Sequence, residues 1–123
     1  MSAYDETCIF CKIAAGEFDT EFVATSENVV AFNDIAPVAP VHILIVPKEH
    51  VVSANDLGPE HGNLWQQILE VAQHAAQTAG VADSGYRLVT NAGAGAGQEV
   101  MHLHVHLLGG GPLGGIVTTK NKG

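Results

Sequence analysis

The sequence predicts a single α+β domain, in which an antiparallel sheet of about five strands carries one long helix and one short N-terminal helix. Its length of 123 residues fits one domain with a sizeable core. Only the segment 58–80 has helical spacing of apolar residues over a long stretch, and the other apolar segments are short and separated by turn residues. We find no internal repeat and no boundary, so the predicted domain spans 1–123, and its Gly-rich end, 109–123, forms a tail.

The first half of the chain is expected to contain the short helix and three strands. Apolar residues at helical spacing in 8–15 predict the helix, and Gly16 suits its end. The segment 21–34 resembles two short strands joined by a turn. The strongly apolar segment 41–47 predicts a central strand that ends at Pro47.

The second half is expected to contain the long helix and two further strands. Pro59 suits the first turn of a helix over 58–80. The core-facing stripe of this helix consists of Leu64, Ile68, Val71, Ala72, Ala75 and Ala79. Strands are expected at 86–91 and 100–108, and the Gly-rich loop 92–98 between them is too long for a tight hairpin.

Composition and charge exclude several kinds of partner. The net charge is −8 with only five lysines and arginines, so we expect no binding to nucleic acid. No apolar stretch reaches the length of a membrane-spanning helix, and we expect no membrane partner. The N-terminus lacks the pattern of a signal peptide, and its two cysteines then favour a reducing, cytoplasmic location.

Three of the seven histidines alternate with apolar residues in the last expected strand. Side chains alternate between the two faces of a strand, so His102, His104 and His106 should share one face while the intervening residues pack on the core. The three imidazoles could bind a transition metal, or one neutral imidazole could act as a nucleophile that the others tune. No carboxylate follows in 107–113, which disfavours a cupin-type metal strand.

The Gly-rich loop before this strand favours the nucleophile. In NAGAGAGQE, 91–99, glycines allow backbone N–H groups to approach phosphate oxygens closely. Asn91 and Gln98 add neutral amide donors. The loop therefore predicts an anion site beside the histidines.

Two separated blocks of the sequence resemble the histidine triad (HIT) family of nucleotide hydrolases and transferases. HLHVHLL, 102–108, fits the family's His-φ-His-φ-His-φ-φ signature, and FNDIAPVAPVHILIVPKEH, 32–50, resembles its other block. The resemblance covers about 8–114, and GQEVMHLHVHLLGGGPLG, 97–114, resembles the bacterial Hint-type branch, which is associated with purine nucleoside phosphoramidase activity.

This resemblance implies a HIT-like fold, a homodimer and a hydrolase. The expected substrates are purine nucleoside 5′-phosphoramidates and related acyl or sulfo nucleotides, hydrolysed through a nucleotidyl-histidine intermediate. The expected ligand is thus a purine nucleoside monophosphate or its amidate or acyl conjugate. Two alternatives stay open: the diadenosine polyphosphate hydrolase branch, and a zinc-stabilised nucleotide-binding interaction protein with residual catalysis.

The resemblance also implies roles for four histidines, without a catalytic metal. His104 would attack the α-phosphorus, and His106 would donate to the phosphate oxygens. His102 would support the nucleophile, and His42 would stand near the leaving group.

The remaining implied site residues would bind the nucleotide. Asp34 would accept the ribose hydroxyls. The apolar walls around the purine would be formed by Phe10, Phe32, Ile35 and Leu44, with Ile9 and Ile13 beside them. Phosphate would be held by Asn91 and by the segment Gly97, Gln98, Glu99 and Val100. Glu99 departs from the pattern, because some eukaryotic members carry Ser there; it could act as the acid for the leaving group or attract a cationic amine.

Cys8 and Cys11 stand two residues apart, a spacing that can chelate one metal ion. Zinc-containing members of the superfamily begin in the same way, and histidines matching His50 and His102 look like their remaining ligands. The resemblance therefore implies a structural Zn²⁺ on these four side chains. The alternative is a pair of reduced core cysteines.

Overall fold

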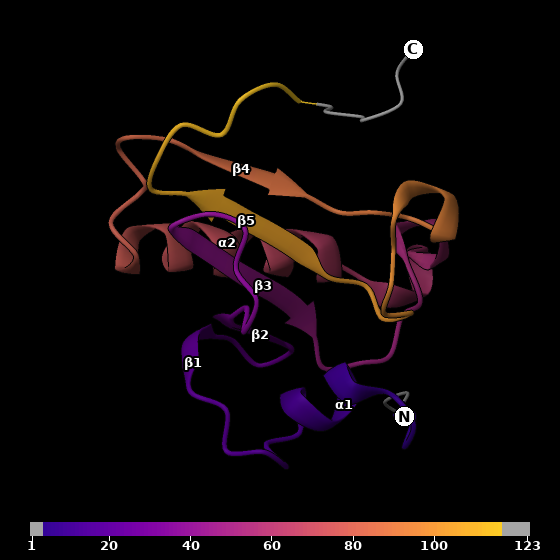
Figure 1. Cartoon of the computed structure of the whole chain (residues 1–123). Coiled ribbons are helices and arrows are strands. Elements are labelled where there is room, and N and C mark those ends of the chain that lie inside the picture. Colours follow the sequence, from indigo (N-terminus) through magenta and orange to yellow (C-terminus); the bar gives the residue numbers. More distant parts are fainter. Residues whose placement is uncertain (1–3, 117–123) are drawn as a thin grey trace.

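The apolar segments of the chain pair into one antiparallel sheet with the strand order β1-β2-β3-β5-β4 (Figure 1). The strands are β1 (Phe22–Thr25), β2 (Val29–Asn33), β3 (Val41–Pro47), β4 (Tyr86–Val89) and β5 (Val105–Gly109). The computed structural model describes residues 4–116, so the rest of the expected tail, 117–123, lies outside the described residues. The prediction of an α+β fold with about five antiparallel strands and two helices is confirmed.

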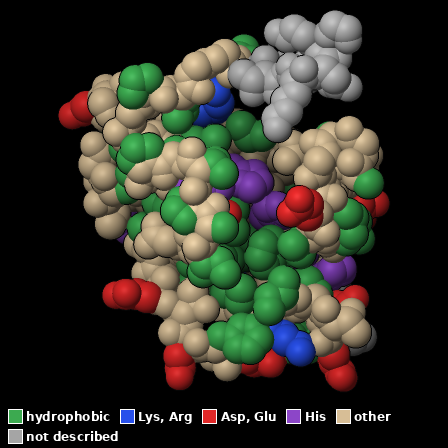
Figure 2. All heavy atoms as spheres, in the orientation of Figure 1, with side chains coloured by type: hydrophobic (Ala, Val, Ile, Leu, Met, Phe, Trp, Pro, Cys, Tyr) green, Lys and Arg blue, Asp and Glu red, His purple; other side chains and the backbone are tan. Residues whose placement is uncertain are grey.

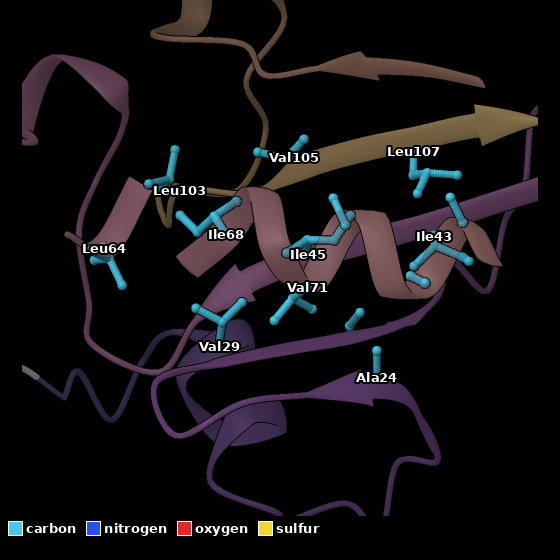
Figure 3. Close-up of a cluster of buried hydrophobic side chains, with 14 of the residues drawn as sticks. Ala24, Val29, Ile43, Ile45, Leu64, Ile68, Val71, Leu103, Val105 and Leu107 are labelled. Carbon is cyan, nitrogen blue, oxygen red and sulfur yellow. The ribbon is translucent and has the colours of Figure 1, made fainter. Parts of the chain in front are cut away.

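The central strand β3 separates two apolar clusters. Ile43 and Ile45 belong to the cluster that packs under α2 (Leu64–Thr78), which Figure 3 shows. Leu44 and Val46 point to the other face and pack with α1 (Ile9–Ala14). Both faces of the sheet are therefore covered, and this explains why 41–47 is apolar at almost every position.

The long helix is shorter at its start than predicted. The sequence pattern suggested 58–80, but α2 begins at Leu64, and Pro59 lies in a separate 3₁₀ turn, Pro59–His61. Gly62, between the two, has φ 60° and ψ −127°, a backbone conformation that a helix cannot contain. No helical segment within residues 4–116 combines the length and the apolar composition of a membrane span.

The buried stripe of α2 agrees with the prediction except near its C-terminal end. The buried residues are Leu64, Ile68, Val71, Ala72, Ala75 and Ala76, whereas Ala79 is only half-buried. The helix ends in a Schellman motif, because the N–H groups of Gly80 and Val81 donate to the carbonyl oxygens of Gln77 and Ala76.

The last strand is also shorter than the predicted segment 100–108. The N–H group of Leu103 donates to the carbonyl oxygen of Val51 at 2.6 Å, outside the ladder, and β5 pairs with β3 only from Val105 onward. His102 and His104 therefore precede the strand, and only His106 lies on it. The alternation nevertheless persists, because Leu103 and Val105 still pack in the cluster under α2.

Candidate active site

A cavity of about 530 Å³ opens on the face of the sheet that carries α1. Its apolar wall is formed by Ile9, Phe10, Ile13, Phe32 and Leu44. Its polar side is formed by Asp34, Asn91, Gly97, Glu99, His104 and His106, with Val100 beside them. Figure 2 shows histidines in a hollow next to a broad apolar patch, with an acidic side chain at the edge. The structure thus brings most of the predicted nucleotide-binding residues around one cavity.

Strand register sets the floor of this cavity. Leu44 on β3 stands opposite Phe32 on β2 and opposite His106 on β5, so these three residues form a row across the sheet. The Phe10 ring from α1 packs edge-on against Phe32 and His104, with centroid separations of 5.9 and 5.0 Å. An apolar slot with an aromatic wall therefore lies directly beside two imidazoles.

His104 presents one ring nitrogen to the cavity. It is nearly buried, with 8% of its surface exposed, and its Nδ1 lies 2.7 Å from the backbone carbonyl oxygen of His102. Since a carbonyl oxygen only accepts, Nδ1 carries the hydrogen, and Nε2 keeps its lone pair. The free Nε2 of a neutral imidazole is a nucleophile.

A chain of hydrogen bonds fixes the tautomer of His106. The Val38 N–H donates to Nδ1 of His42 at 3.1 Å, so the hydrogen of His42 resides on Nε2. This Nε2 lies 2.9 Å from Nδ1 of His106, which must accept. The hydrogen of His106 is therefore on Nε2, the nitrogen left for the cavity, and His106 acts there as a donor.

His106 also remains neutral near pH 7. Burial, and then the neighbouring His104 and His42, lower the pKa of His106 to about 4. The donor beside His104 is thus an uncharged N–H group rather than an imidazolium.

Asp34 follows β2 and has one oxygen fixed. Its Oδ1 accepts the Ala36 N–H at 2.8 Å, and its Oδ2 lies 3.4 Å from Nε2 of His42. The carboxylate lines the cavity and is only partly buried, so it can accept further hydrogen bonds there. Ile35 reaches the cavity rim but is 99% exposed, so it forms no packed wall of the purine site as it stands.

The loop 91–99 places its groups differently from the prediction at one residue. The Gln98 side chain is buried and holds the loop: its Oε1 accepts the Gly93 N–H at 2.7 Å, and its Nε2 donates to the carbonyl oxygens of Val52 and Val100. Its amide therefore ties the loop to Val52 and Val100 and is not available to phosphate. Gly93 and Gly97, both at φ 96°, flank the 3₁₀ turn Ala94–Ala96. The hydrogen bond from the Gly93 N–H to Gln98 Oε1 closes the loop around this turn.

The N–H groups available to an anion lie just beyond this turn. The N–H groups of Gly97 and Gln98 already donate to carbonyl oxygens within the loop. In the described segment 4–116, those of Glu99 and Val100 have no protein acceptor. Together with the Asn91 amide and His106, these two N–H groups form the donor set at the polar side.

Cys8, Cys11, His50 and His102 converge beside the cavity. Their ligand atoms lie within 4.8 Å of one another. The Cys8 Sγ to His102 Nδ1 and Cys11 Sγ to His50 Nδ1 distances are 3.2 and 3.3 Å. Ligands about 2.0–2.3 Å from a tetrahedral zinc are separated by about 3.5 Å, so the group fits a Cys₂His₂ site.

The tautomer of His102 supports this fit. Its Nε2 lies 2.8 Å from the Pro47 carbonyl oxygen and must donate, which leaves the lone pair of Nδ1 facing the two sulfur atoms. Burial lowers the pKa of His102 to about 4, so the ring is neutral. Burial raises the pKa of the Cys11 thiol to about 11, so metal binding would release its proton.

A second cluster, Asp34, His42 and His106, also has ligand atoms within 4.8 Å. Here a hydrogen already lies between the two imidazoles. Moving it to Nδ1 of His42 would set that group against the Val38 N–H. The cluster therefore suits a hydrogen-bond relay better than a metal ion.

Sequence reasoning did not find several groups that matter here. Thr20 and Asn33 also line the cavity. The backbone groups of Val38 and Pro47 set the tautomers of His42 and His102, and no side-chain pattern could reveal them.

Comparison with known proteins gives consistent relatives. The sequence matches the HIT domain family over residues 15–113. It is 43% identical to the purine nucleoside phosphoramidase of Escherichia coli strain K12 over 115 residues, covering 94% of this chain and 97% of that protein. A HIT family hydrolase from Clostridium thermocellum superposes with a TM-score of 0.88 at 42% identity, covering 93% and 99% of the two chains. A HIT family hydrolase from Legionella pneumophila gives 0.81 at 45%, covering 94% and 99%.

Proposed function

Because the chain belongs to the HIT family, we propose that it hydrolyses purine nucleoside 5′-phosphoramidates, and related acyl or sulfo nucleotides, through a nucleotidyl intermediate on His104. One observation carries the proposal. The free Nε2 of His104 and the Nε2–H of His106 face one cavity, with their ring centroids 5.0 Å apart. A nucleophile and a donor for phosphate oxygens thus stand side by side.

Separate regions of the cavity suit the base, the ribose and the phosphate of a nucleotide. The purine fits the apolar slot between Phe10, Phe32 and Leu44. The ribose hydroxyls then lie near Asp34, whose carboxylate accepts them. The α-phosphate falls between the two imidazoles and the N–H groups at the end of the loop 91–99, which donate to its oxygens.

The reaction is a double displacement. Nε2 of His104 forms a bond to phosphorus, and the P–N bond breaks with its electron pair on the amine, which leaves with a proton from solvent. Water then attacks phosphorus and gives up a proton. The bond to His104 breaks, and the neutral imidazole and the nucleoside monophosphate are regenerated. His106 holds the phosphate oxygens in both steps.

We assign Cys8, Cys11, His50 and His102 to a structural zinc site. Zinc there would cross-link the N-terminal helix to the sheet. The His102 ring, fixed at both nitrogens, would hold the carbonyl oxygen that orients Nδ1 of His104. The homodimer implied by the resemblance remains a prediction.

The test is turnover of a fluorogenic adenosine phosphoramidate. His104→Ala should lower kcat by more than about 10³-fold while AMP binding stays measurable. His74→Ala, on an exposed position of α2, is the matched control and should behave as the unaltered protein. A His104→Ala protein that keeps a tenth of the activity, or an unaltered protein without turnover, would refute the proposal.

A further inference from the structure

The cavity is electrostatically unusual for a site that receives a phosphate ester. Its lining contains two carboxylates, Asp34 and Glu99, and no lysine or arginine. His106, the donor next to the phosphate position, is neutral because burial lowers its pKa to about 4. The cavity therefore offers a bound anion only dipoles and no positive charge, while the two carboxylates keep its wall negative.

The two carboxylates are not equivalent. Asp34 is held by the Ala36 N–H and lies beside His42. Glu99 is exposed, and within residues 4–116 its side chain makes no hydrogen bond or ion pair. Protonating a leaving nitrogen requires a carboxyl group held at that atom, whereas attracting a charged substituent requires only that the carboxylate be nearby. The exposed position of Glu99 suits a direct charge effect on a substituent that comes close to the carboxylate.

Glu99 also borders a second cavity. This neighbouring space of about 510 Å³ shares Ile9, Glu99 and Val100 with the first, and Asp5 also lines it. It has no lysine or arginine either. A zinc ion held by two thiolates and two neutral imidazoles would add no net charge. The surface beyond Glu99 is therefore acidic whether or not the metal site is filled.

We propose that Glu99 selects substrates whose leaving amine carries a second, cationic group. This inference rests on the proposed function. The purine fills the apolar slot, and the leaving group must stand opposite the attacking Nε2 of His104. The substituent then extends over the polar side, where Glu99 lies between the two cavities. A cation there is attracted to the carboxylate, and an anionic substituent is repelled.

The experiment compares three adenosine 5′-phosphoramidates of similar length. Their amines are 1,3-diaminopropane, butylamine and β-alanine, which place an ammonium group, a methyl group and a carboxylate at the far end. Opposite charges about 4 Å apart in water change an equilibrium about fivefold. We expect kcat/KM at low salt to rise about fivefold from butylamine to diaminopropane and to fall about fivefold from butylamine to β-alanine. Both differences should shrink as salt is added.

Variants assign the effect to Glu99. Glu99→Gln should bring the three kcat/KM values together, and Glu99→Lys should reverse their order. Glu60→Gln, at an exposed position that lines neither cavity, makes the same change in net charge and should keep the original order.

The possible outcomes separate the two proposals. If the butylamine substrate is hydrolysed but all three values are equal, or if Glu99→Gln keeps the original order, the role of Glu99 is overturned while the proposed function stands. If none of the three substrates is hydrolysed by the unaltered protein, the proposed function fails, and the selection argued from it fails as well.

Discussion

His106 should make the stability of the protein depend on pH between about 4 and 6.5. Burial lowers its pKa from 6.5 to about 4, so the unfolded chain takes up this proton before the folded protein does as the pH falls. The unfolded state then binds more protons, and the free energy of unfolding falls with pH in this window. The contribution of His106 is complete above pH 6.5 and is lost as the pH approaches 4.

The magnitude follows from the two pKa values. Their difference corresponds to about 3.4 kcal/mol at full titration, and about 2.5 kcal/mol of this is lost by about pH 4.5. The ring is partly exposed at the cavity, so solvent screening reduces the expected loss to about 1.5 kcal/mol.

The assay is urea unfolding of the unaltered protein and of His106→Gln at about pH 7 and pH 4.5. Glutamine cannot take up the proton, but its Oε1 can still accept from Nε2 of His42. Lowering the pH should therefore cost the unaltered protein about 1.5 kcal/mol more unfolding free energy than it costs the variant. A difference that stays constant from pH 7 to 4.5 would show that the pKa of His106 is not lowered in the folded protein.

Three further predictions concern the ribose, the zinc site and the core. Asp34→Asn should weaken binding of AMP but not of 2′,3′-dideoxy-AMP, because each charge-assisted hydrogen bond from a ribose hydroxyl contributes about 1.5–3 kcal/mol. Equal losses of affinity for both ligands, measured by calorimetry, would argue against the contact. Protein purified without added metal should contain about one zinc per chain by elemental analysis, and a chelator or Cys8→Ser should lower Tm. A metal-free protein whose Tm does not respond to chelator would refute the zinc site and leave the two cysteines as reduced core thiols. Ile68→Ala, at a fully buried position of α2, should cost about 2–5 kcal/mol of unfolding free energy, whereas Gln73→Ala on the exposed face should change it little.

Local patterns were sufficient to predict the elements of the fold but not where two of them begin. Apolar spacing revealed α2, yet its start depends on the backbone conformation of Gly62, which the spacing does not record. Alternation in 100–108 revealed the two faces correctly. The strand itself starts only at Val105, because a partner distant in sequence, the carbonyl oxygen of Val51, takes the Leu103 N–H.

The candidate site shows the same division. The triad could be inferred from its motif, and the family resemblance pointed to the four possible zinc ligands, which the structure brings together. The tautomers of the imidazoles could not be inferred from the sequence, because backbone groups of Val38, Pro47 and His102 determine which nitrogen carries each hydrogen. Gln98 illustrates the limit, since its amide has the right chemistry for phosphate but binds backbone groups of Gly93, Val52 and Val100 instead.

The hydrogen bonds from Val38 through His42 to His106 have a direction that the side chains cannot reverse. A backbone amide is permanently a donor, so neither imidazole can exchange its tautomer without losing a partner. Rotating the His106 ring by half a turn would place a carbon against the hydrogen of His42. The backbone therefore sets which nitrogen of His106 offers a hydrogen to the cavity, and this donor is in place before any ligand arrives.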